Sequence, residues 1–176
     1  MYKKLLVCAI VCLCASMSAS AARADEISFS DTIPVQDTTW TDTMNIPKFN
    51  PALGVLQSID FTLEGTVMGE AKYESLDADP ATITVDLQAQ ITVQRPDLSN
   101  LIVVLPVVNV VENATAFDGG LDFDGGSGST FSNLLGMDSI SASSPPPPGD
   151  LALFTGIGDI ILPVSAVGTS SGSGAG

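Results

Sequence analysis

Residues 82–94 alternate between polar and apolar side chains without an exception. The apolar positions are Ile83, Val85, Leu87, Ala89, Ile91 and Val93. Successive side chains of a β-strand point to opposite faces of a sheet, whereas a helix would scatter these residues around its circumference. The segment is therefore predicted to be a long strand with one buried face and one face in water, as in an antiparallel sheet.

Two further long strands are expected on either side of this segment. Apolar residues at odd positions between 59 and 67 alternate with polar ones, and an apolar run covers residues 101–111. Turn residues at 75–80 and 95–100 separate the three strands, which are predicted to form an antiparallel meander. Pro106 removes one backbone donor from the third strand, so a bulge or an edge position is expected there.

Shorter runs at residues 27–33, 40–46 and 139–143 are predicted to be further strands. The apolar positions between 151 and 166 change from odd to even numbers, which predicts a β-bulge near Gly156 and Gly158. Four prolines at 145–148 indicate a polyproline II connector. With about eight or nine strands and no helix beyond the N-terminal segment, the fold class is predicted to be an all-β, two-sheet antiparallel β-sandwich of jelly-roll or Ig-like type.

The first 24 residues have the features of a secretory signal peptide. Two lysines precede an apolar stretch at residues 5–15, and Ala22 and Ala24 stand at the spacing of an A-x-A cleavage site. We expect a signal-peptide helix over residues 1–24, export by the Sec pathway, and a secreted or cell-surface location. No later apolar stretch has the length of a membrane span, so no stable membrane span is expected after cleavage.

The chain is accordingly divided into the signal peptide, a single β-sandwich domain over residues 25–168, and a Gly/Ser-rich tail over residues 169–176. The last eight residues, "TSSGSGAG", include no side chain that forms a core, so they are predicted to be flexible. A chain of 152 residues, 176 less the first 24, is long enough to bury one substantial core.

The composition excludes several classes of function. The chain contains no histidine, and its three cysteines all lie in the first 24 residues, which leaves no disulfide or thiol nucleophile after cleavage. Three basic and 20 acidic residues then remain, a net charge of 3 − 20 = −17, and such a chain repels nucleic acid. A serine nucleophile would need Lys48 or Lys72 as its base, and neither lies in an S-x-x-K pattern. The nearest enzyme class is a glycosidase with a carboxylate pair, but Glu64, Glu70 and Glu74 fall on the solvated strand face. The protein is therefore predicted not to be an enzyme, with no cofactor.

Residues 116–131, "AFDGGLDFDGGSGSTF", present the sharpest chemical alternative. Asp118, Asp122 and Asp124 could supply oxygen ligands to calcium if the glycines let the chain fold back. The spacing is not that of an EF-hand, and the segment is not repeated. The favoured interpretation is a glycine-turn hairpin in which Leu121 and Phe123 point to the core and the aspartates point outward.

Trp40 is the only tryptophan in the chain and the candidate for a glycan contact. Carbohydrate-binding surfaces usually present aromatic platforms, and a single indole is a weak one. The sequence favours Trp40 as a core residue that fills the sandwich or covers the end of a sheet.

Several segments together resemble the choice-of-anchor E domain family of bacterial secreted proteins. The segments are "ISFSDTIPVQDTTW" (27–40), "IPKFNPALGVL" (46–56), "ESLDADPATITVDL" (74–87), "AFDGGLDFDGGSGSTF" (116–131) and "DLALFTGIGDIILPVSAVGTSSGSG" (150–174). The resemblance implies a position between a signal peptide and a C-terminal sorting signal, one type of which is the PEP-CTERM signal of bacteria that make exopolysaccharide. It implies no activity and no catalytic residues.

This chain departs from the family in lacking the C-terminal sorting signal. Similar proteins continue past the Gly/Ser-rich stretch with another strand, so the chain is expected to be either truncated or freely secreted. A missing strand would leave an unpaired sheet edge open to strand addition by a partner.

From these features we expect a non-catalytic, secreted or cell-surface structural component of the extracellular matrix. A glycan-binding module of the exopolysaccharide matrix is the alternative. The expected partners are exopolysaccharide or other surface proteins, and nucleic acid is not expected.

Overall fold

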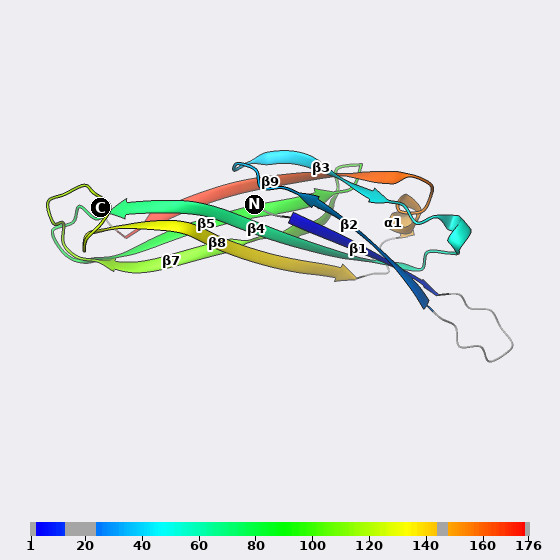
Figure 1. Ribbon diagram of the computed structural model, residues 1–176, viewed down its shortest axis with the longest axis horizontal. Helices are drawn as coiled ribbons and strands as arrows, with labels where there is room; N and C mark the ends of the chain where they lie inside the picture. Colours follow the sequence, from blue (N-terminus) through cyan, green and yellow to red (C-terminus); the bar gives the residue numbers. More distant parts are fainter. Residues whose placement is uncertain (1–2, 13–23, 144–147, 175–176) are drawn as a thin grey trace.

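The computed structural model describes residues 3–12, 24–143 and 148–174, which form an elongated all-β sandwich (Figure 1). The first sheet has the order β2-β1-β4-β8, and the second has the order β3-β9-β5-β6, with β7 also paired to β5. All pairs are antiparallel, as the alternation in residues 82–94 predicts. The strands of the described ranges are β1 (Lys3–Cys12), β2 (Ala24–Ile33), β3 (Trp40–Pro47), β4 (Ser58–Glu74), β5 (Ala81–Gln94), β6 (Asn100–Val104), β7 (Val107–Ala114), β8 (Gly128–Ser143) and β9 (Asp159–Ser173).

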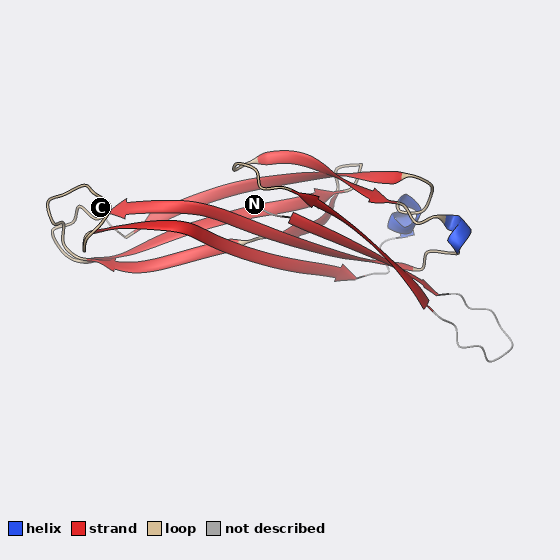
Figure 2. Ribbon diagram, viewed as in Figure 1, coloured by secondary structure: helices blue, strands red, loops and turns tan. Residues whose placement is uncertain are grey.

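Two short helices lie together at one end of the sandwich (Figure 2). They are the 3₁₀ turn η1 (Pro51–Leu53) and the helix α1 (Pro148–Leu153). The sequence predicts no helix here, and α1 begins at the last residue of the expected polyproline connector. Proline is well suited to a first helical position, because its missing N–H would have no helical partner there. Of the other connector residues, 145–147 lie outside the described residues. Neither helix is long and apolar enough to cross a membrane.

The main core lies between the sheets over the half of the sandwich nearer α1. The alternating inward residues of three long strands fill it, namely Ile59, Phe61 and Leu63 of β4, Ala89, Ile91 and Val93 of β5, and Ile160, Leu162 and Val164 of β9. A smaller cluster of Ile83, Val85 and Ala114 occupies the other half, with Tyr73 and Phe131 packed against it. The predicted parity is confirmed in both β5 and the even-numbered positions of β9.

Of the two alternatives predicted for Pro106, the edge position is confirmed, because the strands on either side of it lie at the edge of the second sheet. The third expected strand is divided into β6 and β7, which share one edge of β5 on either side of the proline. The carbonyl of Pro106 accepts a hydrogen bond from the Ala89 N–H at 3.0 Å, so the break preserves contact with β5.

The expected three-strand meander is wrong in one respect, because β4 belongs to the opposite sheet from β5. The connection at residues 75–80 crosses between the layers, and the Ser75 N–H donates to the carbonyl of Ser127 at 2.8 Å. Both strands have a wholly apolar face. In opposite sheets these faces cover each other, which a flat hairpin would not allow.

Residues 3–12 form strand β1 between β2 and β4, so the expected signal-peptide helix is wrong for this part of the chain. Residues 13–23, including Ala22 of the cleavage motif, lie outside the described residues, and Ala24 is the first residue of β2. A short apolar run suits either a strand or a helix. Here two flanking strands supply backbone partners on both sides, whereas an isolated ten-residue helix would have little stability in water.

The C-terminal stretch also differs from its prediction. Residues 169–173 continue β9 and pair with residues 84–88 of β5, so they are not a tail. Backbone pairing needs no large side chain, and the long edge of β5 supplies the partner groups. The expected bulge is absent as well, because Gly156 and Gly158, with φ of 150° and 87°, lie in the loop that precedes β9.

Candidate functional site: a groove between open strand edges

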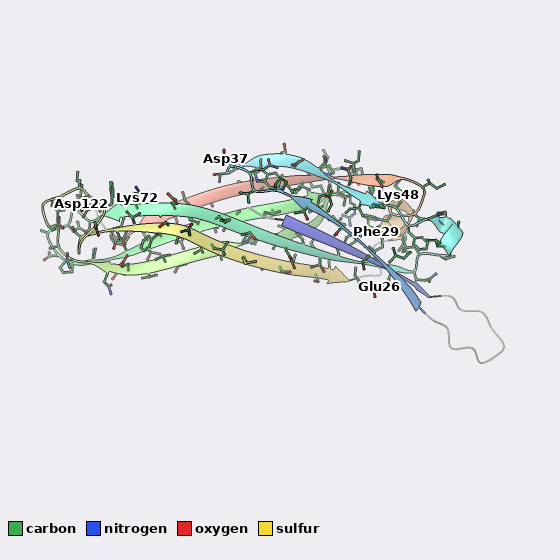
Figure 3. All side chains as sticks on the ribbon, viewed as in Figure 1. Glu26, Phe29, Asp37, Lys48, Lys72 and Asp122 are labelled. Atoms are coloured by element: carbon green, nitrogen blue, oxygen red, sulfur yellow. The ribbon has the colours of Figure 1, made fainter. Side chains whose placement is uncertain are left out.

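A groove of about 630 Å³ lies between the sheets at the end of the sandwich away from α1. Its lining residues are Glu70, Ala71, Lys72, Tyr73 and Glu74 of β4, Ile83, Val85 and Leu87 of β5, Ser170, Ser171, Gly172 and Ser173 of β9, and Leu76, Leu121 and Phe123 of the adjoining loops. In Figure 3, Lys72 of β4 and Asp122 of the loop before β8 lie at this end of the molecule. The groove thus combines the ends of three strands with two loops.

The groove exists because two strands extend beyond their neighbours. On one edge, β4 pairs with β1 only over residues 58–65, although β8 follows its other edge as far as Glu74. In the facing sheet, β3 pairs with one edge of β9 only as far as Ala166. On the other edge of β9, the pairing with β5 continues as far as Ser173. Among the described residues, no strand pairs with the free edges of β4 at 66–74 or of β9 at 167–173. These edges present backbone donors and acceptors along the groove.

A second hollow of about 270 Å³ continues the groove toward the middle of the sandwich. It shares Glu70, Leu87 and Ser170 with the first hollow and reaches Thr38. Together the two hollows follow β4 from Val67 to its end, so the groove is long and narrow and runs parallel to a strand.

The interior of the groove is apolar and its rim is charged. Ile83 and Val85 form the floor as members of the smaller core cluster, while Glu70 and Lys72 are exposed at the rim. Tyr73 is half-buried, and burial, followed by the nearby Glu112 carboxylate, raises the pKa of its hydroxyl. The tyrosine is therefore neutral at physiological pH. This combination suits an extended apolar segment with polar or basic residues on its outer face.

The three aspartates of the predicted calcium loop each accept a hydrogen bond from nearby backbone. Asp118 Oδ1 accepts from the Gly120 N–H at 2.9 Å, Asp122 Oδ1 from the Asp124 N–H at 3.1 Å, and Asp124 Oδ1 from the Gly125 N–H at 2.8 Å. These contacts are typical of turns built on aspartate side chains. Within the described ranges, no group of three or more His, Cys, Asp or Glu residues could hold a metal ion.

The predicted inward positions of Leu121 and Phe123 are wrong. Their side chains are 68% and 41% exposed, and both lie at the mouth of the groove. The strand alternation on which the prediction depended does not apply, because residues 115–127 form a loop. Phe123 has a φ of 57°, in the left-handed region that a strand does not use.

Glu74 has a role that the sequence does not indicate. Its Oε2 accepts from the Phe123 N–H at 2.8 Å, and its Oε1 accepts from the Ser127 hydroxyl at 2.7 Å. The sequence pattern places Glu74 with Glu64 and Glu70 on the solvated face of the strand. Its partners are 49 and 53 residues away along the chain, so no local pattern could identify them. Glu74 fixes the loop at the end of β4.

Trp40 is the first residue of β3 and lies opposite Ala166 of β9. Its side chain is only 9% exposed and belongs to the main core. The structure therefore places it as the sequence interpretation favours, and it offers no exposed platform for a sugar ring.

No family model, no curated protein and no solved structure matches this chain. The resemblance to the choice-of-anchor E family stays a prediction.

Proposed function

We propose that this protein is an exported, non-catalytic β-sandwich that serves as a structural component of the cell surface or extracellular matrix. The observation that carries the proposal is the pairing of polar side chains between neighbouring strands. Thr62 and Ser141 share a hydrogen bond of 2.9 Å, Thr82 donates to Asn113 at 2.9 Å, and Asn109 donates to Asp86 at 2.6 Å. Both sheets thus carry hydrogen-bonded polar side chains outside an apolar core, and such cross-strand pairs stabilise a sheet.

The N-terminal residues and the charge support export. Residues 1–24 have the order of a signal peptide, and removing them raises the net negative charge from −14 to −17. Acidic side chains keep such a protein soluble and away from other anionic surfaces. The buried position of Trp40 gives the alternative of a glycan-binding module no support.

The export part of the proposal is tested by expressing the full chain with a C-terminal tag in a bacterial host. We expect the exported protein to begin at Asp25, as determined by mass spectrometry of the intact protein. Replacing the small residue before the cleavage point (Ala24→Lys) should block processing, because the A-x-A motif needs a small residue there. The matched control Arg23→Lys changes the tolerant middle position and should be processed normally.

The non-catalytic part is tested by incubating the purified protein with a panel of polysaccharides and measuring the release of reducing sugar. We expect no release above that of a heat-denatured sample. Hydrolysis that disappears when Glu70 or Glu74 is changed to Gln would contradict the proposal.

A further inference from the structure

Strand β1 fills a space of one strand between β2 and β4. It is antiparallel to both neighbours, from Lys3 opposite Ile33 and Gly65 to Ile10 opposite Glu26 and Ser58. In the described residues, β2 and β4 do not pair with each other. Among the described residues, β1 is the strand to which β2 is paired. Removal of residues 1–24 would therefore empty the position of β1, here called the slot, and leave unpaired backbone groups on β2 and on residues 58–65 of β4.

The slot requires an apolar occupant on its inner side. Three inward residues of β4, at positions 59, 61 and 63, are almost completely buried, so a polar side chain beside them on this face would be unfavourable. Residues directly opposite in a sheet lie on the same face. The register places Leu5 opposite Leu63, Val7 opposite Phe61 and Ala9 opposite Ile59. An occupant must therefore have apolar residues at every second position.

The outer side of the slot is acidic. Glu64 is exposed and lies opposite Lys4, and Asp60 lies four residues before it on the same face of β4. An occupant with a lysine or arginine opposite Glu64 gains a favourable cross-strand pair. A second copy of the mature chain is disfavoured, because it carries the same net charge of −17, from 3 − 20 charged residues.

The free edge continues beyond the slot into the groove. Residues 66–74 of β4 have no strand partner on this edge among the described residues, and apolar side chains of β5 lie behind them. A strand that runs antiparallel to β4 could therefore pair along the groove and then enter the slot without changing direction. After removal of β1, the acceptor edge of β4 would extend from Ser58 toward Glu74, with an irregularity in the pairing of β4 with β8 between Gly69 and Ala71.

We propose that the mature protein binds an extended segment of another polypeptide along the β4 edge, antiparallel to β4. The segment has apolar residues at alternate positions and a basic residue opposite Glu64. In the precursor, residues 3–12 occupy part of this edge, and removal of the leader exposes it. The inference rests on the leader removal proposed above. Binding of this kind adds a strand to a sheet, with the backbone supplying affinity and alternate side chains supplying specificity.

The test uses the mature chain, residues 25–176, and a synthetic peptide of residues 3–12 with Cys8→Ser and Cys12→Ser. We expect the peptide to slow amide hydrogen exchange in residues 27–33 of β2 and 58–65 of β4 by at least about tenfold. If the mature chain is unfolded alone, the same peptide should induce its β-sheet circular dichroism spectrum. No binding and no induced folding would overturn the proposal.

Two peptide variants test the register. Val7→Asn changes the position opposite Phe61 and should weaken binding at least about tenfold, because it places an amide against the core. The matched Leu6→Asn changes the position opposite Thr62, which is partly exposed, and should bind nearly as well as the parent. Equal loss in both variants would contradict the proposed register.

A charge swap tests the outer face. Glu64→Lys in the protein and Lys4→Glu in the peptide should each weaken binding several-fold, and the two changes together should restore it. Lack of restoration would exclude the proposed pair.

Two further outcomes separate this inference from its alternatives. Self-association of the mature chain without peptide, together with no protection by the peptide, would assign the edge to a second copy and overturn the proposal. An exported protein that keeps residues 3–12 would overturn the proposed function, whereas correct processing to Asp25 without peptide binding would overturn this inference alone. The folded full chain allows a further measurement, in which a protease cuts at a site placed within residues 13–23. After the cut, residues 3–12 should co-elute with the remainder of the chain. The Val7→Asn variant should lose this co-elution.

Discussion

Arg95 and Asp150 join the turn after β5 to helix α1. Arg95 Nε donates to Asp150 Oδ1 at 2.6 Å and Nη2 donates to Oδ2 at 2.7 Å, while Nη1 donates to the carbonyl of Asn100 at 2.7 Å. The hydrogen bond with Asp150 raises the pKa of the guanidinium, and the aspartate side chain is only 6% exposed. Paired, planar contacts of this type fix geometry as well as adding energy. This ion pair therefore fixes α1 to the turn after β5.

We expect Asp150→Asn to lower the free energy of unfolding by about 3 kcal/mol, because it leaves the guanidinium without its buried countercharge. Urea denaturation followed by circular dichroism gives the measurement. The exposed Asp97, which accepts from the Ser99 hydroxyl at 2.7 Å, provides the matched control. Asp97→Asn should cost clearly less, and equal losses would show that the ion pair is not what holds α1.

The raised pKa of Tyr73 predicts that the stability of the fold decreases at alkaline pH. Burial, and then the Glu112 carboxylate, raise its pKa above the ordinary value of 10.0. Since the folded state holds the proton more tightly, its contribution to stability is complete below pH 10 and is lost as pH rises through the folded pKa. Tyr73 is the only tyrosine after residue 24, so phenolate absorbance in the mature chain reports it alone. A titration midpoint at or below the ordinary value would contradict the prediction, and Tyr73→Phe should abolish the transition.

At the scale of single elements, β8 crosses β7 closely at one glycine. A Cβ atom added to Gly136 would overlap the backbone carbonyl of Val107, which belongs to the facing sheet. We expect Gly136→Ala to destabilise the fold by roughly 1–3 kcal/mol, as overpacking commonly does. Gly149→Ala is the control, because an added Cβ there has no atom within 4 Å. Thermal and urea unfolding of the two variants should differ clearly, and similar curves would show that the crossing can relax.

The loop between β7 and β8 gives a prediction about metal. Its aspartates accept hydrogen bonds from the loop backbone, and Glu74 fixes the loop to β4. We therefore expect the melting temperature in calcium and in a chelator to agree within about 1 °C, because a ligand stabilises only the state that it binds. Magnesium at the same ionic strength provides the control for screening. A rise that is specific to calcium and is lost in Asp122→Asn would revive the calcium-loop hypothesis.

The elements that could be predicted from the sequence are those whose cause is local. The alternation in β5, the even positions in β9 and the edge position at Pro106 each follow from the residue types of one short segment. The assignment of β4 to the opposite sheet depends on which strands cover its apolar face. The loop at residues 115–127 likewise depends on Glu74, a residue about 50 positions earlier. The groove could not be predicted, because it results from where four strands end relative to one another.

At the scale of the whole molecule, the dominant feature is the imbalance of charge. After residue 24 the chain has three basic and 20 acidic residues, a net charge of 3 − 20 = −17. One of the three basic residues, Arg95, is held in its ion pair with Asp150. Exposed acidic side chains on both sheets therefore repel one another with little local compensation, which opposes the compact state.

We expect the melting temperature of the mature chain to rise with sodium chloride, on the order of 5 °C between 0.01 M and 0.15 M, since the screening length falls from about 30 Å to about 8 Å over this range. Two exposed residues of β4 provide a matched pair of variants. Glu70→Lys changes the net charge from −17 to −15 and Lys72→Glu changes it to −19, so the first should reduce the salt response and the second should enlarge it. Calorimetry at constant pH gives the measurement. A melting temperature that is independent of salt in all three proteins would contradict this prediction, because the acidic residues would then be spaced widely enough to be screened by water alone. In that case the acidic surface would affect the choice of partner but not the stability of the fold.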